Sequence, residues 1–125
     1  MGWMTLHSIS IAYPDDPSQQ DKQILEQFMN AFGECITCVY CRNHFRTMFM
    51  DYKSKVPTWK NSKKDLFLAI CRMHNAVNKR LDKPRPKTVA ECIEFLKRAT
   101  SYTSQREFRD KYCTYLLGDW SHNLS

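Results

Sequence analysis

Three cysteines at equal spacing, followed by a histidine, are the residues of this sequence best suited to chemistry. They are Cys35, Cys38 and Cys41, with His44 three residues further on. At the first turn of a helix, unpaired N–H groups and the helix dipole stabilise a thiolate, and two sulfurs at C-x-x-C spacing lie close enough to bridge. For Cys38 and Cys41 we therefore expect one sulfur facing outward for thiol exchange and the other one turn deeper. A pair of buried structural cysteines is the alternative.

A stripe of polar residues stands in a later segment with helical periodicity. Its members are separated by three, four and seven positions, so they lie on one side of a helix: Cys71, His74, Asn75 and Asn78. Asparagine is a poor helix former, so two of them in mid-helix indicate a use. We interpret the stripe as a wall of hydrogen-bonding groups facing a polar ligand with a flat ring. The alternative is a hydrated surface with one buried histidine. The core face of this segment is Leu66, Leu68, Ala69, Ile70, Met73 and Val77.

A metal site is a second interpretation of the same residues. The cysteine run with His44 cannot meet one ion on a continuous helix, because each step of three residues turns the side chain by about 60°. A better zinc site joins the redox pair to two residues of the later stripe: Cys38, Cys41, Cys71 and His74. We keep a zinc-stabilised helical binding module as the alternative function. It leaves the two asparagines of the stripe without a role.

Cap signals divide the chain into helices. The first helix is expected over residues 2–12, where the prolines of YPDDPS end it. Four pairs of a serine or threonine with an acidic residue three positions later mark further helix starts: Ser18 with Asp21, Ser62 with Asp65, Thr88 with Glu91, and Ser104 with Glu107. A short helix is expected to begin at the cysteine cluster and to carry Phe45, Met48 and Phe49 before SKVPTW ends it. Five or six helices with short loops predict an all-α helical bundle.

The composition is that of one globular domain. The chain has 125 residues, 42% of them hydrophobic, and a net charge of +6. Its basic residues are scattered, whereas a nucleic-acid surface concentrates them in a stripe, so we expect no nucleic-acid partner. No segment is typical of a transmembrane helix or a signal peptide, so we expect no membrane association. Six cysteines in an even number and at tight spacing indicate redox or metal chemistry.

Three motifs, in this order, resemble the Erv/ALR family of flavin-linked sulfhydryl oxidases. The first is WMTLHSISIAYPDDP, with Trp3, His7 and Tyr13 in the family's places. The second is CVYCRNHF, which resembles the redox pair and the His-Phe that follows it. The third is CRMHNAVNKRLDK, which resembles the flavin-binding helix. The resemblance covers most of the chain and implies a single domain over 1–125, with a core over about 1–100 and a C-terminal helical extension over 101–125.

The resemblance implies a four-helix bundle with a short additional fifth helix and FAD at the mouth of the bundle. It implies that protein or small-molecule dithiols are oxidised to disulfides, while electrons pass through the redox pair to FAD and then to oxygen, giving hydrogen peroxide. The substrate would attack Cys38, and Cys41 would attack the flavin. The residues implied to line the cofactor are Trp3, His7, Tyr13, Phe45, Cys71, His74, Asn75, Val77, Asn78, Leu81 and Lys83, with Lys87 as a second charge for the diphosphate.

The resemblance further implies a homodimer and a structural disulfide between Cys71 and Cys92. The chain departs from the family at Ile36-Thr37, where members carry Tyr-Pro. The roles of Cys35 and Cys113 stay open: they pair with each other, link subunits, or relay electrons from substrate to Cys38. The compartment stays open as well, since members act in the mitochondrial intermembrane space, the secretory pathway and the host cytoplasm during infection by large DNA viruses.

Overall fold

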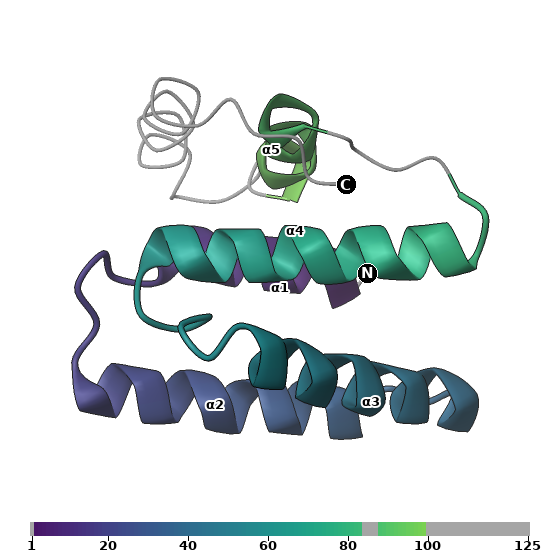
Figure 1. Cartoon of the computed structure of the whole chain (residues 1–125), viewed down its shortest axis with the longest axis horizontal. Helices are drawn as coiled ribbons and strands as arrows, with labels where there is room; N and C mark the ends of the chain where they lie inside the picture. Colours follow the sequence, from purple (N-terminus) through teal and green to yellow (C-terminus); the bar gives the residue numbers. More distant parts are fainter. Residues whose placement is uncertain (1, 84–87, 100–125) are drawn as a thin grey trace.

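The protein is a bundle of four helices with a fifth helix lying across it (Figure 1). The structure is a computed structural model that describes residues 2–83 and 88–99. Its helices are α1 Gly2–Ala12, α2 Gln19–Glu34, α3 Val39–Lys55, α4 Lys63–Arg80 and α5 Val89–Ala99. In Figure 1, α1 and α4 form one layer and α2 and α3 the other, with α5 outside the first layer. The predicted all-α class, with a four-helix bundle and a fifth helix, is confirmed.

The predicted cap residues begin three of these helices. Ser18 and Asp21 form a reciprocal capping box, with N–H to oxygen distances of 2.9 and 3.0 Å. The hydroxyl oxygen of Ser62 accepts from the backbone N–H of Asp65. The same hydroxyl donates to the carboxylate of Asp65, whereas at Ser18 the backbone N–H donates to the carboxylate of Asp21. Thr88 accepts from the N–H of Glu91 at 3.2 Å and so begins α5.

The third helix begins at the cysteine cluster and ends within SKVPTW, as expected, but it is not short. The helix α3 has 17 residues and continues to Lys55. Its inner face carries Phe45 and Phe49, both buried, and Phe49 packs edge-on against buried Trp59 in the next loop, with ring centroids 5.1 Å apart. That loop therefore folds back onto the core through Trp59 and holds the middle of α3 in place.

A contact between α2 and α3 explains a glycine in the last turn of α2. A Cβ atom built on Gly33 would lie 3.2 Å from Cδ1 of Phe45, which is tighter than ordinary van der Waals contact. Gly33 therefore lets the Phe45 ring lie against the backbone of α2. This contact lies next to the cysteine-bearing turn, so it fixes where α3 starts relative to α2.

The helix α5 is attached to α4 by a disulfide. Cys71 and Cys92 are joined, with their Cα atoms 6.4 Å apart, as the resemblance implies. Both residues are almost completely buried, and α5 also contacts α1. The bond closes a loop of 21 residues, for which chain-entropy arguments give about 3 kcal/mol of stabilisation.

The end of α4 is held by a Schellman motif. The N–H of Lys83 donates to the carbonyl of Asn78 at 2.8 Å, and the N–H of Asp82 donates to that of Lys79 at 3.2 Å. Asp82 has a φ of 54°, the left-handed conformation that this motif requires and that glycine adopts most easily. The motif fixes the backbone on which Asn78 and Lys83 stand.

Some sequence predictions lie outside the described residues. These are the C-terminal extension over 101–125, the helix start at Ser104 and Glu107, and the residues Lys87 and Cys113. Within residues 2–83 and 88–99, no helix combines the length and apolar character that a bilayer crossing needs.

Replacing Asp82 with glycine should stabilise the protein. Glycine removes the cost of a left-handed residue carrying a side chain, so we expect the free energy of unfolding to rise by about 0.5–1 kcal/mol in urea titrations followed by far-UV circular dichroism. The matched control Asp82→Ala keeps the strain and should give no gain. Equal effects of glycine and alanine would contradict this account.

Candidate active site

A hollow of about 360 Å³ lies beside the redox pair, where the four bundle helices come together at one end. Its walls are mostly aromatic and aliphatic and include one sulfur and one guanidinium. The lining residues are Trp3, Phe32, Ile36, Tyr40, Cys41, His44, Phe45, Val77, Arg80 and Leu81. Of the two redox cysteines, only Cys41 lines the hollow. The hollow therefore offers flat apolar walls with a thiol at the edge.

Cys38 occupies the N-cap position of α3. Its sulfur accepts a hydrogen bond from the backbone N–H of Cys41 at 3.3 Å. The thiols of Cys38 and Cys41 are both free and exposed. We expected Cys41 to lie one turn deeper than Cys38, and the structure does not show this difference in burial. What distinguishes the two thiols is their direction, because Cys41 borders the hollow and Cys38 does not.

Hydrogen bonding separates the pKa values of the two thiols. The side chain and backbone N–H of Cys41 donate to the Cys38 sulfur and lower the pKa of Cys38. The same side-chain hydrogen bond raises the pKa of Cys41, while the nearby charge of Arg80 acts in the opposite direction. In the reduced pair, Cys38 therefore loses its proton before Cys41 does. A thiolate at a helix N-cap is the form that takes part in disulfide exchange.

The polar stripe of α4 packs against α1 instead of water. The ring of His74 stacks on Trp3 with centroids 4.4 Å apart and planes 6° from parallel. On another side, Nδ1 of His74 lies 3.1 Å from Nε2 of His7, so one ring donates a hydrogen bond to the other. A planar ligand cannot enter between Trp3 and His74, because the two rings are already in contact.

The interpretation of the stripe as a hydrated surface was wrong. All four of its residues are buried: Cys71 at 0%, His74 at 9%, and Asn75 and Asn78 at 8% exposure. Burial lowers the pKa of His7 to about 3, with a smaller contribution from His74. Burial also lowers the pKa of His74 to about 4, with Lys83 contributing. Both histidines are therefore neutral at physiological pH, as their shared hydrogen bond requires.

The residues that the resemblance assigned to the cofactor fall into groups in the structure. Four of them border the hollow: Trp3, Phe45, Val77 and Leu81. His74, Asn75 and Asn78 are buried on α4. Lys83 is exposed just beyond the end of α4. His7 is 1% exposed and contacts His74, so it acts by positioning that ring.

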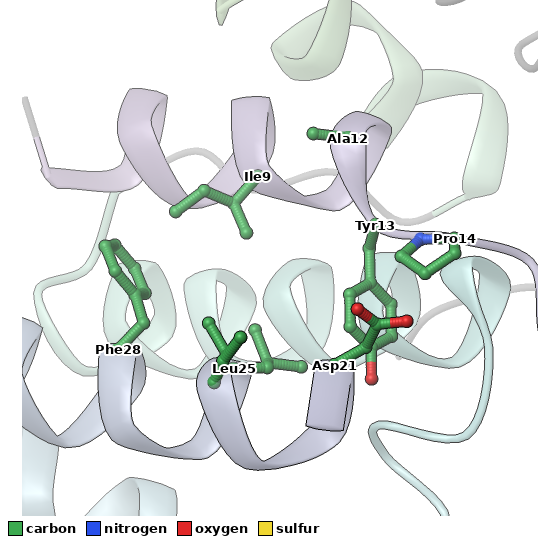
Figure 2. A pocket seen from close by; sticks show the side chains of 8 residues that line it. Ile9, Ala12, Tyr13, Pro14, Asp21, Leu25 and Phe28 are labelled. Atoms are coloured by element: carbon green, nitrogen blue, oxygen red, sulfur yellow. The ribbon is translucent and has the colours of Figure 1, made fainter. Parts of the chain in front are cut away.

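Two of the assigned residues lie elsewhere. Cys71 is completely buried in its disulfide, which leaves it no surface for a ligand. Tyr13 lies at the far end of α1, and its hydroxyl donates to the carbonyl of Lys60 at 2.6 Å. Figure 2 shows Tyr13 at a different hollow, between α1 and α2, where it stands near Pro14, Asp21 and Leu25. In the structure, Tyr13 holds the loop before α4 and Cys71 holds α5, and neither residue lines the hollow beside Cys41.

Sequence reasoning missed Arg80 and Tyr40 as residues of the site. The guanidinium of Arg80 lies 5.7 Å from the centre of the Tyr40 ring, and both line the hollow. Arg80 follows Val77 by three positions on α4, so the helical spacing that gave the stripe could have found it. Tyr40 gave no such signal, because the sequence does not show which way a side chain between the two cysteines points.

The zinc site is not supported. Cys71 is bonded to Cys92, so its sulfur is not available as a thiolate ligand. Among the described residues, no group of three histidine, cysteine or acidic side chains is arranged to hold a metal ion. The redox interpretation uses Cys38 and Cys41 without this conflict.

The residues present fit a flavin dinucleotide. A flat tricyclic ring fits between apolar and aromatic walls, which the hollow provides. A thiol that is to reduce this ring must lie at its edge, and Cys41 lies at the edge of the hollow. The diphosphate needs cations, and Arg80 at the hollow and exposed Lys83 three residues later are suitably placed on the chain. The donor set is thus aromatic, thiol and cationic.

A helical bundle with a C-x-x-C pair at the edge of an aromatic hollow defines the class of small helical thiol-disulfide redox proteins. The sequence model of the Erv1 / Alr family matches residues 1–108, and the chain belongs to that family.

The relatives are both cellular and viral. The chain is 34% identical over 83 residues to the mitochondrial FAD-linked sulfhydryl oxidase ERV1 of Saccharomyces cerevisiae, which covers 66% of this chain and 42% of that protein. It is 35% identical over 81 residues to the FAD-linked sulfhydryl oxidase of African swine fever virus, covering 65% of each. The crystal structure of the yeast Erv1 core matches with a TM-score of 0.62 at 30% identity, covering 82% of this chain and 80% of that one. The chain thus spans less than two thirds of either relative.

The neutral histidine pair should make the folded protein sensitive to acid. The unfolded chain binds a proton at His7 below pH 6.5, whereas the folded chain does not until about pH 3. Stability from this residue is therefore complete above pH 6.5 and is lost as the pH falls toward 3. At pH 5.5 we expect a loss of about 1.4 kcal/mol from His7, measured by urea unfolding against pH 7.5. The variant His7→Gln should lose this part of the slope, and an unchanged slope would contradict the assignment.

Proposed function

We propose that this protein is an FAD-dependent sulfhydryl oxidase that makes disulfide bonds in substrates with two thiols. The observation that carries the proposal is the position of Cys41, an exposed cysteine of the C-x-x-C pair that borders an aromatic hollow next to the buried stripe of α4. The relatives in yeast and African swine fever virus are named FAD-linked sulfhydryl oxidases, which supports the same activity here. The acceptor in the proposed reaction is oxygen, and hydrogen peroxide is its product.

Bound FAD would supply two-electron chemistry that thiols alone cannot perform with oxygen. The chain's residues would hold and surround it. Trp3, Phe45 and Val77 would form apolar walls, and Arg80 and Lys83 would face the diphosphate. His7 and His74 would keep Trp3 in place through the stack and the buried hydrogen bond.

The redox pair would exchange electrons with the substrate through Cys38. Its thiolate is stabilised by the N–H of Cys41 and by the start of α3, so Cys38 ionises first in the reduced pair. Cys41 keeps the proton until Cys38 is no longer charged. Arg80 then favours the Cys41 thiolate at the edge of the hollow. The two thiols thus have different tasks set by one hydrogen bond.

An absorbance spectrum and an oxygen electrode test this function. The purified protein should be yellow and should consume oxygen with dithiothreitol. The variant Cys41→Ser should retain the flavin spectrum and lose about 10³-fold or more in turnover, because no thiol of the pair then borders the hollow where the flavin would lie. Thr47→Ser, an exposed change on the same helix, is the matched control and should retain the rate. A colourless protein that binds zinc would contradict the proposal.

We also propose that two copies associate through α1 and α2. The resemblance implies a homodimer, and the second hollow, of about 330 Å³, is lined by apolar residues of these two helices (Figure 2). Ile24 stands at its edge and is 56% exposed, a large apolar surface for a residue facing water. A second copy of the same surface would cover it, as expected for a two-fold contact.

A charge at Ile24 should separate the copies. We expect Ile24→Glu to raise the dimer dissociation constant by at least about tenfold in sedimentation experiments, since it buries an unpaired charge. Met50, 67% exposed on α3, offers the control Met50→Glu, which should leave association unchanged. If the two variants behave alike, the interface lies elsewhere.

A further inference from the structure

Cys35 is an exposed free thiol that the proposed function does not use. It is the C-cap residue of α2, and Cys38 is the N-cap residue of α3. Between them, Ile36 packs against the core and its N–H donates to the carbonyl of Gly33 at 3.3 Å. The two helix ends and the anchored Ile36 therefore hold Cys35 and Cys38 on one short turn, with the same spacing as Cys38 and Cys41.

The chemistry of the redox pair favours Cys38 as the leaving group. In thiol–disulfide exchange, the sulfur with the lower pKa leaves faster. Cys38 has its pKa lowered and Cys41 has its pKa raised, so a nucleophile gains most by attacking a sulfur bonded to Cys38. Within the Cys38–Cys41 disulfide that sulfur is Cys41, which borders the hollow where the cofactor would lie. In a disulfide between Cys38 and Cys35, the same favourable attack would fall on an exposed sulfur that lies away from the hollow.

We propose that Cys35 is a second disulfide partner of Cys38, so that a disulfide between Cys35 and Cys38 is the surface at which substrate thiols enter. The site then holds three cysteines in a relay, with Cys35 at the surface, Cys38 in the middle and Cys41 at the hollow. This inference rests on the proposed function in one respect, because the oxidase activity is what would form the Cys38–Cys41 disulfide. The relay itself concerns exchange among this chain's own sulfurs.

The relay balances in three exchanges. First, the Cys35 thiolate attacks Sγ of Cys38 in the Cys38–Cys41 disulfide, the Cys35–Cys38 bond forms, and Cys41 leaves as a thiolate beside Arg80. Second, a substrate thiolate attacks Sγ of Cys35, and Cys38 leaves with the bonding electron pair. The second thiolate of the substrate then attacks the sulfur joined to Cys35. The substrate is released as a disulfide, and Cys35 and Cys38 remain as two thiols.

The first exchange also removes the cause of the high pKa of Cys41. The charge and hydrogen bonding of the Cys38 sulfur raise the pKa of Cys41 in the reduced pair. When Cys38 is bonded to Cys35, it carries no charge, while the charge of Arg80 still favours the Cys41 thiolate. Cys41 therefore becomes an acceptable leaving group in the step that needs it.

Disulfide trapping in the full-length variant Cys41→Ser tests the relay without cofactor or oxygen. The variant is treated with glutathione disulfide, quenched in acid, labelled with N-ethylmaleimide and digested with trypsin. Cleavage after Lys22 and Arg42 leaves Cys35 and Cys38 in one peptide, residues 23–42. We expect this peptide to be lighter by two hydrogens, because Cys35 displaces glutathione from Cys38. A peptide that keeps glutathione on Cys38 and carries the label on Cys35 would overturn the proposal.

The matched control is the double variant Cys35→Ser with Cys41→Ser, whose peptide should retain the glutathione. All of these positions are exposed, so serine should leave the fold intact, as far-UV circular dichroism will check. If the double variant loses glutathione as fast as Cys41→Ser, Cys35 is not the displacing thiol and the relay is wrong.

The wild-type protein gives an independent measurement. When one disulfide is formed among the three cysteines, the remaining thiol takes the label. We expect a measurable share of the label on Cys41, which reports the Cys35–Cys38 disulfide. Label on Cys35 alone would show that the outer disulfide does not form and would overturn the relay, whereas the spectrum and oxygen consumption would still report on the oxidase activity separately.

Discussion

The contact of His74 with α1 is the interaction on which the site depends. Its ring stacks on Trp3 and shares a hydrogen bond with His7, and both histidines are buried and neutral. A neutral pair can share one N–H, whereas two charged rings in this position would repel each other without water to screen them. The same contact fixes the rotation of α4 about its axis, and so determines that Val77 and Arg80 turn toward the hollow.

The position of Cys38 at a helix start is the second constraint. An N-cap residue must accept the N–H of a residue in the first turn, and here a sulfur takes the place that serine or aspartate usually fills. Because the cap residue is a cysteine, the hydrogen bond that begins α3 also lowers the pKa of the Cys38 thiol. Gly33 contributes by letting Phe45 lie against α2, which brings the start of α3 close to the end of α2.

Much of the fold could be predicted because local signals decide it. Ser18, Ser62 and Thr88 are cap residues whose side chains satisfy N–H groups within the same turn, and no distant part of the chain is needed for that. The packing of the inner face of α3 was not predictable in this way. It depends on Trp59, which returns from the next loop to pack against Phe49, a contact between parts of the chain that no local pattern announces.

The part of the site that depends on helical spacing was predictable. The part that depends on where single side chains point was not. The stripe on α4 followed from spacing, and the resemblance added Trp3 and His7 as its neighbours on α1. A motif gives the order of residues but not the end of the bundle at which each one lies, so it did not show that the Tyr13 hydroxyl donates to the carbonyl of Lys60. Cys35 and Cys41 are each three residues from Cys38, so spacing alone does not show which of them is its redox partner. The cysteines differ in the structure through the cap hydrogen bond from Cys41 to Cys38 and through the hollow, which Cys41 borders and Cys38 does not.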